Sequence, residues 1–178
     1  MPDGVWDETS VYGNLRNYKN DKGEGLYRRS LYTIWKRTAA PPTMLIFDAP
    51  TREICMVKRS RTNTPLQALS LLNEVTFIEA ARVLAQRMIT EGGSTPEQRI
   101  AFGYKRVTAH APSPQDLKLL ASGLQKRLEK FRKAPESAKQ LVGLGEAKTA
   151  DKLEPAELAA YTLTANIILN LDEVVTRE

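Results

Sequence analysis

The stretch RTNTPLQALSLLNEVTFIEAARVLAQRM, residues 61–88, carries the clearest helix signals in the chain. Thr64 is suited to cap a helix, because its hydroxyl can accept from a free backbone N–H. Pro65 fits the first helical position, and Gln67 stands three residues after the cap, as in a capping box. The stretch therefore predicts a helix that begins at Thr64 and Pro65.

The apolar residues of this stretch recur at helical spacing, so we expect them to face a core. A strand would need period two, which is absent. Asn73 lies between two apolar runs and is suited to cap a second helix, so we expect a bend or a short break there. The first run is Leu66, Leu69 and Leu72, and the second is Phe77, Ala81, Leu84 and Met88.

Composition favours a folded chain without a membrane span. The chain has 178 residues, of which 42% are hydrophobic, and a domain of this size buries roughly 70% of its unfolded surface. Its apolar runs are shorter than the roughly 20 residues that cross a bilayer. The start MPDGVWDETS has neither the basic nor the apolar part of a signal peptide. We expect neither a membrane span nor a signal peptide in this chain.

The single cysteine, Cys55, and the single histidine, His110, limit the cofactors. One cysteine excludes an internal disulfide, and the absence of C-x-x-C-H excludes covalent c-type haem within these residues. One residue of each kind does not suit a structural zinc site. We expect this chain to hold no cofactor of its own.

The N-terminal third is the least regular part. Residues 26–38 place Tyr27, Leu31, Ile34 and Trp35 on one helical face, which predicts a helix ended by Pro41. The apolar runs MLIF (44–47) and ICMV (54–57) each suit a short strand. The aromatic residues Tyr27, Tyr32 and Trp35 are expected to point inward.

Proline marks the later helix starts, with Ser94 or Thr95 before Pro96, Ser113 before Pro114, Ala134 before Pro135 and Glu154 before Pro155. We therefore predict a mostly α fold, an irregular multi-helix bundle with a loop-rich N-terminal third and room for one short two-stranded element. The chain is expected to be a single domain over 1–178. It would comprise an irregular surface segment (1–25), a helix with a long basic connection (26–63) and a helical body (64–178).

Positive charge collects in residues 16–61, which hold eleven Lys and Arg against four Asp and Glu. A guanidinium group can bind a phosphate or a carboxylate through two parallel hydrogen bonds, so these arginines suit an anionic partner. The structural alternative is that they fasten the connection to the helices. Nucleic acid fits poorly, because no nucleic-acid motif is present. The candidate binding residues are Arg28, Arg29, Arg37, Arg52, Arg59 and Arg61.

Asp48 and Glu53 have the chemistry of a glycosidase carboxylate pair, but capping or arginine pairing explains both. Cys55 is expected to be a small buried residue, and His110 a surface or capping residue. A polar group is expected to be structural, because an irregular chain that enters a helix needs side-chain hydrogen bonds. This group is Asp48, Thr62, Asn63, Thr64 and Gln67.

Several segments together form a specific pattern. They are RRSLYT (28–33), WKRT (35–38), FDAP (47–50), Arg52–Glu53 with Cys55, RTNTPLQAL (61–69), Leu72–Asn73, EAAR (79–82), and an ending from PAELAA (155–160) to LNLDE (169–173). These segments resemble the C-terminal planctomycete-specific domain of unknown function, and the likeness covers nearly the whole chain from Trp6. The family's domain usually begins well upstream of Met1, so the chain resembles its C-terminal portion.

The resemblance implies an extracytoplasmic setting and a large parent protein that often carries cytochrome-c-type domains, with haem c held there. We therefore expect a non-catalytic structural or interaction module whose partner is the remainder of that protein. The first alternative is part of a hydrolase or carbohydrate-active module whose site is shared with N-terminal sequence outside this chain. The second is anion or nucleic-acid binding through the basic N-terminal third.

Overall fold

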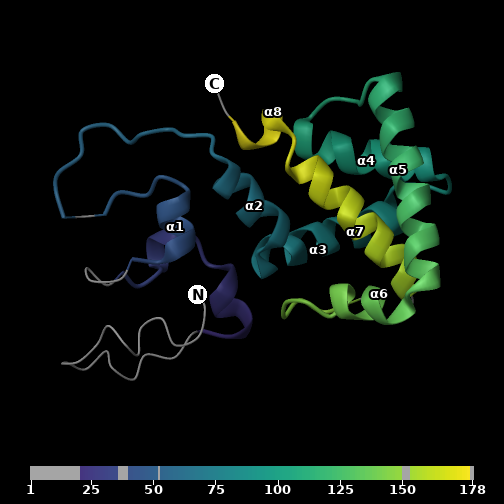
Figure 1. Ribbon diagram of the computed structural model, residues 1–178, viewed down its shortest axis with the longest axis horizontal. Helices are drawn as coiled ribbons and strands as arrows, with labels where there is room; N and C mark the ends of the chain where they lie inside the picture. Colours follow the sequence, from purple (N-terminus) through teal and green to yellow (C-terminus); the bar gives the residue numbers. More distant parts are fainter. Residues whose placement is uncertain (1–20, 36–39, 52, 150–152, 177–178) are drawn as a thin grey trace. The chain divides into compact units, whose positions relative to one another are not determined.

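The computed structural model describes residues 21–35, 40–51, 53–149 and 153–176. Over these residues it contains helices and no strand (Figure 1), so the predicted mostly α fold is confirmed and a two-stranded element is not found in them. The elements are η1 (Gly23–Tyr27), η2 (Ser30–Tyr32), α1 (Pro42–Ile46), α2 (Pro65–Asn73), α3 (Val75–Glu91), α4 (Pro96–Thr108), α5 (Pro114–Lys133), α6 (Pro135–Val142), α7 (Pro155–Leu169) and α8 (Asp172–Val175).

The chain forms two compact units, Met1–Ser70 (unit 1) and Leu71–Glu178 (unit 2). Unit 1 holds η1, η2, α1 and the first part of α2, and unit 2 holds α3 to α8. The single domain expected from the sequence stays a prediction.

In unit 1 the helix predicted over residues 26–38 is wrong for residues 26–35. They form the end of η1, then η2, joined by extended residues; residues 36–38 lie outside the described part. Tyr27 and Leu31 are 59% and 78% exposed, and Tyr32 is also exposed instead of pointing inward. A short helix without a buried face gains too little to form in water, which explains the error.

The two apolar runs also differ from the predicted strands. Residues 44–46 belong to α1, because Pro42 provides a favourable first helical position. Asp48 follows with a φ of 58°, a left-handed conformation that turns the chain away from the helix. The run 54–57 is exposed and irregular.

The predicted start of α2 is confirmed. The Thr64 hydroxyl accepts from the Gln67 N–H at 3.3 Å, and the Gln67 side chain accepts from the Thr64 N–H at 3.0 Å. The predicted buried face is wrong, because Leu66, Leu69 and Leu72 are exposed while Gln67 is 4% exposed. The hydrogen bonds of Gln67, and not the packing of the leucines, determine which face of α2 is buried.

The break expected near Asn73 is present, since α2 ends at Asn73 and α3 begins at Val75. The cap is Glu74 and not Asn73, because the Glu74 carboxylate accepts from the Thr76 N–H at 3.1 Å. A carboxylate near a helix N-terminus also interacts favourably with the helix dipole. The residue after Asn73 therefore begins the second helix.

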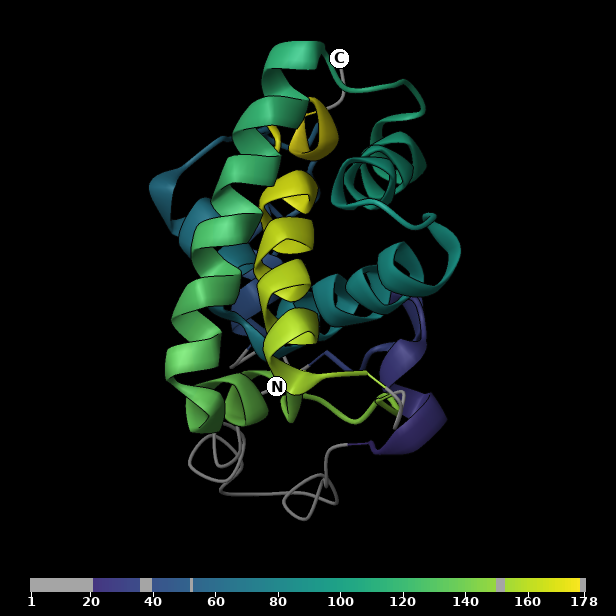
Figure 2. The ribbon, with the colours of Figure 1, turned by 90° about the vertical axis from the view of Figure 1, so that its right-hand side faces the viewer.

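Unit 2 is built around α7, which contacts α3, α5, α6 and α4. Figure 2 shows α7 (yellow) running alongside α5 (green). Most residues of α7 are buried, including Leu158, Tyr161 and Ile168. A helix that is apolar on every side is expected at the centre of a bundle.

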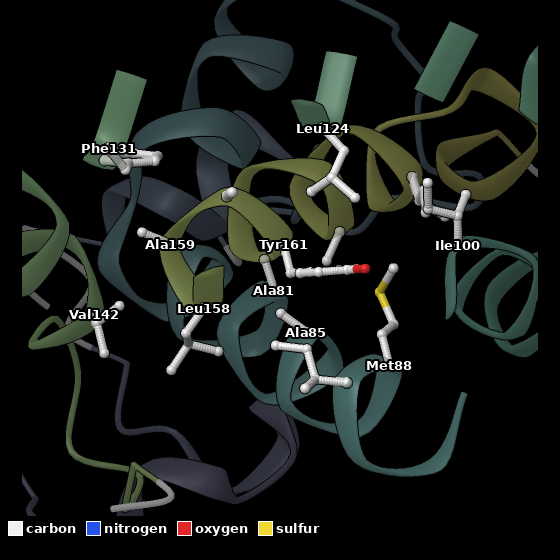
Figure 3. Packing of buried hydrophobic residues seen from close by; sticks show 14 of the residues in the cluster. Ala81, Ala85, Met88, Ile100, Leu124, Phe131, Val142, Leu158, Ala159 and Tyr161 are labelled. Atoms are coloured by element: carbon white, nitrogen blue, oxygen red, sulfur yellow. The ribbon is translucent and has the colours of Figure 1, made fainter. Parts of the chain in front are cut away.

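The core of unit 2 joins small and large side chains from several helices (Figure 3). Ala81, Ala85 and Met88 of α3 are fully buried, as is Ile100 of α4. Gly103 makes room for Met88, because a Cβ at position 103 would lie 2.6 Å from the Met88 sulfur. Of the second predicted stripe, Ala81 and Met88 thus lie in the core and Leu84 packs against it, while Phe77 is partly buried and not part of this cluster.

The predicted caps of unit 2 are present at two helices. Thr95 and Gln98 form a capping box at α4, and the Ser113 hydroxyl accepts from the Asp116 N–H at α5. On α5, Leu120, Leu124 and Phe131 lie at helical spacing and are buried. The short helix α8 has no counterpart in the sequence prediction.

Candidate functional site

Asp48 joins the two ends of the irregular chain between α1 and α2 by bonding to Thr62. Its two carboxylate oxygens accept from the Thr62 hydroxyl at 2.9 Å each, and one also accepts from the Thr62 N–H at 2.7 Å. The two residues are fourteen positions apart. We call residues 49–51 and 53–61 the clasped loop, because the Asp48–Thr62 contact holds its ends together.

Gln67 fixes the same base from α2. Its Nε2 donates to the Ile46 carbonyl at 2.8 Å and to the Thr62 hydroxyl at 3.0 Å. The carbonyl at the end of α1 is thereby satisfied, as helix ends require. Of the predicted polar group, Asp48, Thr62, Thr64 and Gln67 thus join α1, the clasped loop and α2, and Asn63 is exposed.

The clasped loop exposes apolar and cationic side chains. Ile54, Cys55, Met56 and Val57 are all exposed, which corrects the expectation that Cys55 is buried. Lys58, Arg59 and Arg61 follow and are also exposed. Compact loops with pinned ends often carry function.

A hollow of about 400 Å³ lies between this loop and the segment before it. Apolar and aromatic side chains dominate its walls, and Arg59 contributes a cation. Among the described residues, the lining includes neither Asp48 nor Glu53. The walls are formed by Ser30, Leu31, Trp35, Met44, Phe47, Ala49, Pro50 and Arg59.

Residues 26–32 present a second exposed surface in unit 1. Leu26, Tyr27, Leu31 and Tyr32 are exposed, and Arg28 and Arg29 lie between them and are exposed too. We call this stretch the tyrosine–arginine segment. Tyrosine and arginine are enriched at protein–protein interfaces.

The predicted arginines are only partly brought together. Arg59 lines the hollow, Arg61 lies beside the Thr62 clasp, and Arg28 and Arg29 belong to the tyrosine–arginine segment. Arg37 and Arg52 lie outside the described residues.

His110 is exposed and belongs to a polar cluster in unit 2. Its Nε2 lies 2.9 Å from a Glu173 oxygen, and the Tyr104 hydroxyl donates to the other oxygen at 2.8 Å. The hydrogen bond to Glu173, and then that to the Ala111 carbonyl, raises the pKa of His110. Hydrogen bonds from His110 and Tyr104 lower the pKa of Glu173.

Tyr104 completes this cluster. The hydrogen bond to Glu173, followed by desolvation, raises the pKa of its hydroxyl to about 12. These contacts join the end of α4 to α8, so their effect is to hold the C-terminal helix in place. Sequence reasoning missed them because Glu173 lies 63 residues from His110.

Buried Arg82 was also missed. It is 1% exposed, and its guanidinium donates to the Thr149 hydroxyl at 2.8 Å and the Ala147 carbonyl at 2.7 Å. One turn earlier, buried Glu79 accepts from the Glu146 N–H at 2.6 Å. The two side chains fasten the connection between α6 and α7, and neighbouring sequence carries no signal for partners more than sixty residues away.

Within the described part of the chain, no group of three or more His, Cys, Asp or Glu residues is arranged to hold a metal ion. Among its helices, none combines the length and apolar character needed to cross a bilayer. What the geometry of unit 1 offers is an apolar hollow, exposed tyrosines and arginines, and a loop with a fixed base. These features define a surface suited to binding.

The fold and this surface define an all-α protein with a candidate binding unit at its N-terminal end. The chain belongs to the PSD1 family, described as a protein of unknown function (DUF1553), which matches residues 5–124. That match includes the clasped loop and the tyrosine–arginine segment. Neither the curated proteins nor the solved structures contain a match to the chain.

Proposed function

We propose that the chain is a non-catalytic structural or interaction module of a larger extracytoplasmic protein that carries cytochrome-c-type domains. Unit 1 binds another part of that protein, and unit 2 is the stable helical body. The compartment and the cytochrome-c-type domains rest on the family resemblance of the sequence. In this proposal haem c is held by those domains and not by this chain.

The hollow in unit 1 is the observation that carries the proposal. Leu31, Trp35, Met44 and Phe47 give it apolar walls, and exposed tyrosines continue from η1 and η2. Interfaces commonly place one anchor side chain in such a pocket and surround it with tyrosine and arginine. Arg59 suits a carboxylate or carbonyl oxygen on the partner near the anchor.

The hydrogen bonds of Asp48 support a non-catalytic role. Both carboxylate oxygens accept from Thr62, so the group is used in closing the loop. A general acid or base would instead need a proton-transfer position facing a substrate. This observation favours the interaction module over the carbohydrate-active alternative.

The test compares two exposed leucines in the full chain. Leu31 in the tyrosine–arginine segment is 78% exposed and Leu119 on α5 is 71% exposed. We expect Leu31→Asp to weaken binding to the separately expressed remainder of the parent protein by about tenfold or more, because burial of a leucine contributes about 1.5–3 kcal/mol. Leu119→Asp should leave the affinity unchanged. Titration calorimetry measures both.

A second variant probes the hollow itself. Ala49 lines it, so Ala49→Leu would fill it and should also weaken binding. Circular dichroism spectra should match the wild type for all three variants. Equal affinities for Leu31→Asp and Leu119→Asp, or steady turnover of a substrate by the chain alone, would contradict the proposal.

A further inference from the structure

The tip of the clasped loop exposes four consecutive apolar residues, Ile54 to Val57. Ile54 is 72% exposed, Val57 is fully exposed, and Cys55 and Met56 are exposed as well. Neighbouring side chains of a non-helical run point in different directions. Most of this run is therefore left uncovered by the described residues of unit 1, with Met56 46% exposed, although such runs are usually kept out of water.

Three cations follow the apolar tip at once. Lys58, Arg59 and Arg61 are exposed, and Glu53 is the acid beside them among the described loop residues. Arg59 also lines the hollow. An apolar tip next to a cationic border matches the boundary between acyl chains and anionic headgroups.

The base of the loop is already ordered. Asp48 binds Thr62, and Gln67 binds both Thr62 and the Ile46 carbonyl. A loop with a fixed base loses less conformational entropy on binding than a free segment. The tip is thus presented ready to bind.

We propose that the clasped loop inserts Ile54–Val57 into the acyl boundary of an anionic lipid bilayer, while Lys58, Arg59 and Arg61 contact headgroup phosphates. A protein surface would cover one side of the run, whereas the lipid boundary covers all sides together. The insertion is peripheral and needs no spanning helix. It rests on the exposed tip of the loop, whereas the proposed function rests on the hollow and the tyrosine–arginine segment; Arg59 belongs to both surfaces.

Sedimentation of the full chain with lipid vesicles tests the proposal. We expect binding to phosphatidylcholine vesicles that contain about 30% phosphatidylglycerol, and little binding to phosphatidylcholine alone. Val57→Asp and Ile54→Asp should each lower the partition coefficient by about tenfold. Leu119→Asp, an equally drastic change at an exposed leucine of α5, should not.

Charge reversal tests the cationic border. The double variant Lys58→Glu and Arg61→Glu should abolish the preference for anionic lipid, and about 0.5 M salt should weaken binding of the wild type. The matched control reverses two exposed lysines of α5, Lys118→Glu and Lys126→Glu. A Met56→Trp reporter should shift its fluorescence to the blue and be quenched by brominated acyl chains.

Two outcomes would overturn the proposal. The first is no binding of the wild type to anionic vesicles; if Val57→Asp then abolishes binding to the parent protein, the loop is assigned to a protein interface. The second is binding that survives Val57→Asp while the Met56→Trp variant shows no more quenching than the wild type, which has two tryptophans of its own; this result means adsorption by charge only. Leu31→Asp reports on the proposed function separately.

Discussion

Gln67 shows how one polar side chain can set the orientation of a helix. It is nearly fully buried, and its amide accepts from the Thr64 N–H while donating to the Ile46 carbonyl and the Thr62 hydroxyl. Sequence spacing identified the first bond, because a capping box is local. The other two depend on residues brought together by folding.

We predict that Gln67→Met lowers the free energy of unfolding by about 2 kcal/mol. The substitution keeps the size of the side chain but leaves the partly buried Ile46 carbonyl and the Thr64 N–H without their partner. Gln140→Met, at an exposed position of α6, is the matched control and should change stability by less than about 0.5 kcal/mol. Urea denaturation followed by circular dichroism measures both, and equal midpoints would contradict the prediction.

At the scale of elements, α8 is too short to be stable alone and is held by side-chain contacts. Glu173 lies in its first turn and accepts from Tyr104 and His110 near the end of α4. Asp116 of α5 is a further acid that acts on Tyr104 and Glu173. Docking of α8 therefore depends on the ionisation of this cluster.

The shifted pKa values of His110 and Glu173 determine how the docking of α8 depends on pH. The raised pKa of His110 means that its contribution is complete below about pH 6.5 and is lost as pH rises through the folded value. The lowered pKa of Glu173 means that its contribution is complete above about pH 4.5 and is lost as pH falls through the folded value. Docking should be strongest between these limits.

We predict that Glu173→Gln lowers the pKa of His110, because the charged hydrogen-bond partner is removed. Asp172→Asn, a change at the neighbouring residue of α8, should leave that pKa close to the wild-type value. His110 is the single histidine of the chain, so its ring proton signals can be followed by nuclear magnetic resonance as pH is varied. A wild-type pKa in Glu173→Gln would exclude the contact in solution.

At the scale of the whole molecule, the two units differ in how they treat apolar side chains. Unit 2 buries a cluster of leucines, alanines and isoleucines around α7, whereas the described residues of unit 1 leave most of their large apolar side chains exposed. Stability is expected to come mainly from unit 2, because burial of apolar surface is the dominant favourable term in folding. Unit 1 keeps apolar surface available for binding.

We predict that Leu124→Ala lowers the free energy of unfolding by about 3 kcal/mol, because Leu124 is 4% exposed and its removal leaves a cavity. Leu69→Ala should cost less than about 0.5 kcal/mol, because Leu69 is 57% exposed. The two substitutions remove the same atoms, so each serves as a control for the other. Thermal and urea unfolding measure the stability of both variants. An equal loss of stability in the two variants would contradict the burial seen in the structure.

The sequence by itself determined the α class of the protein and the starts of α2, α4, α5, α6 and α7. Thr64, Thr95 and Ser113 mark their helices because caps and prolines act on neighbouring backbone groups within a few residues. The stripe predicted for α3 was correct at Ala81, Leu84 and Met88, because α3 has a core on one side. Such local interactions can be predicted from the sequence, because they involve residues only a few positions apart.

Only the tertiary structure decided which apolar residues are covered and how the candidate site is assembled. Leu69 and Leu31 have the spacing of core residues but lie exposed, while Gln67 and Arg82 are buried. Burial depends on what packs against a face, and the partners of Asp48 and Arg82 are separated from them by long stretches of chain. The closed base of the clasped loop and the hollow beside it are therefore products of folding, because the distances that create them do not exist in the extended chain.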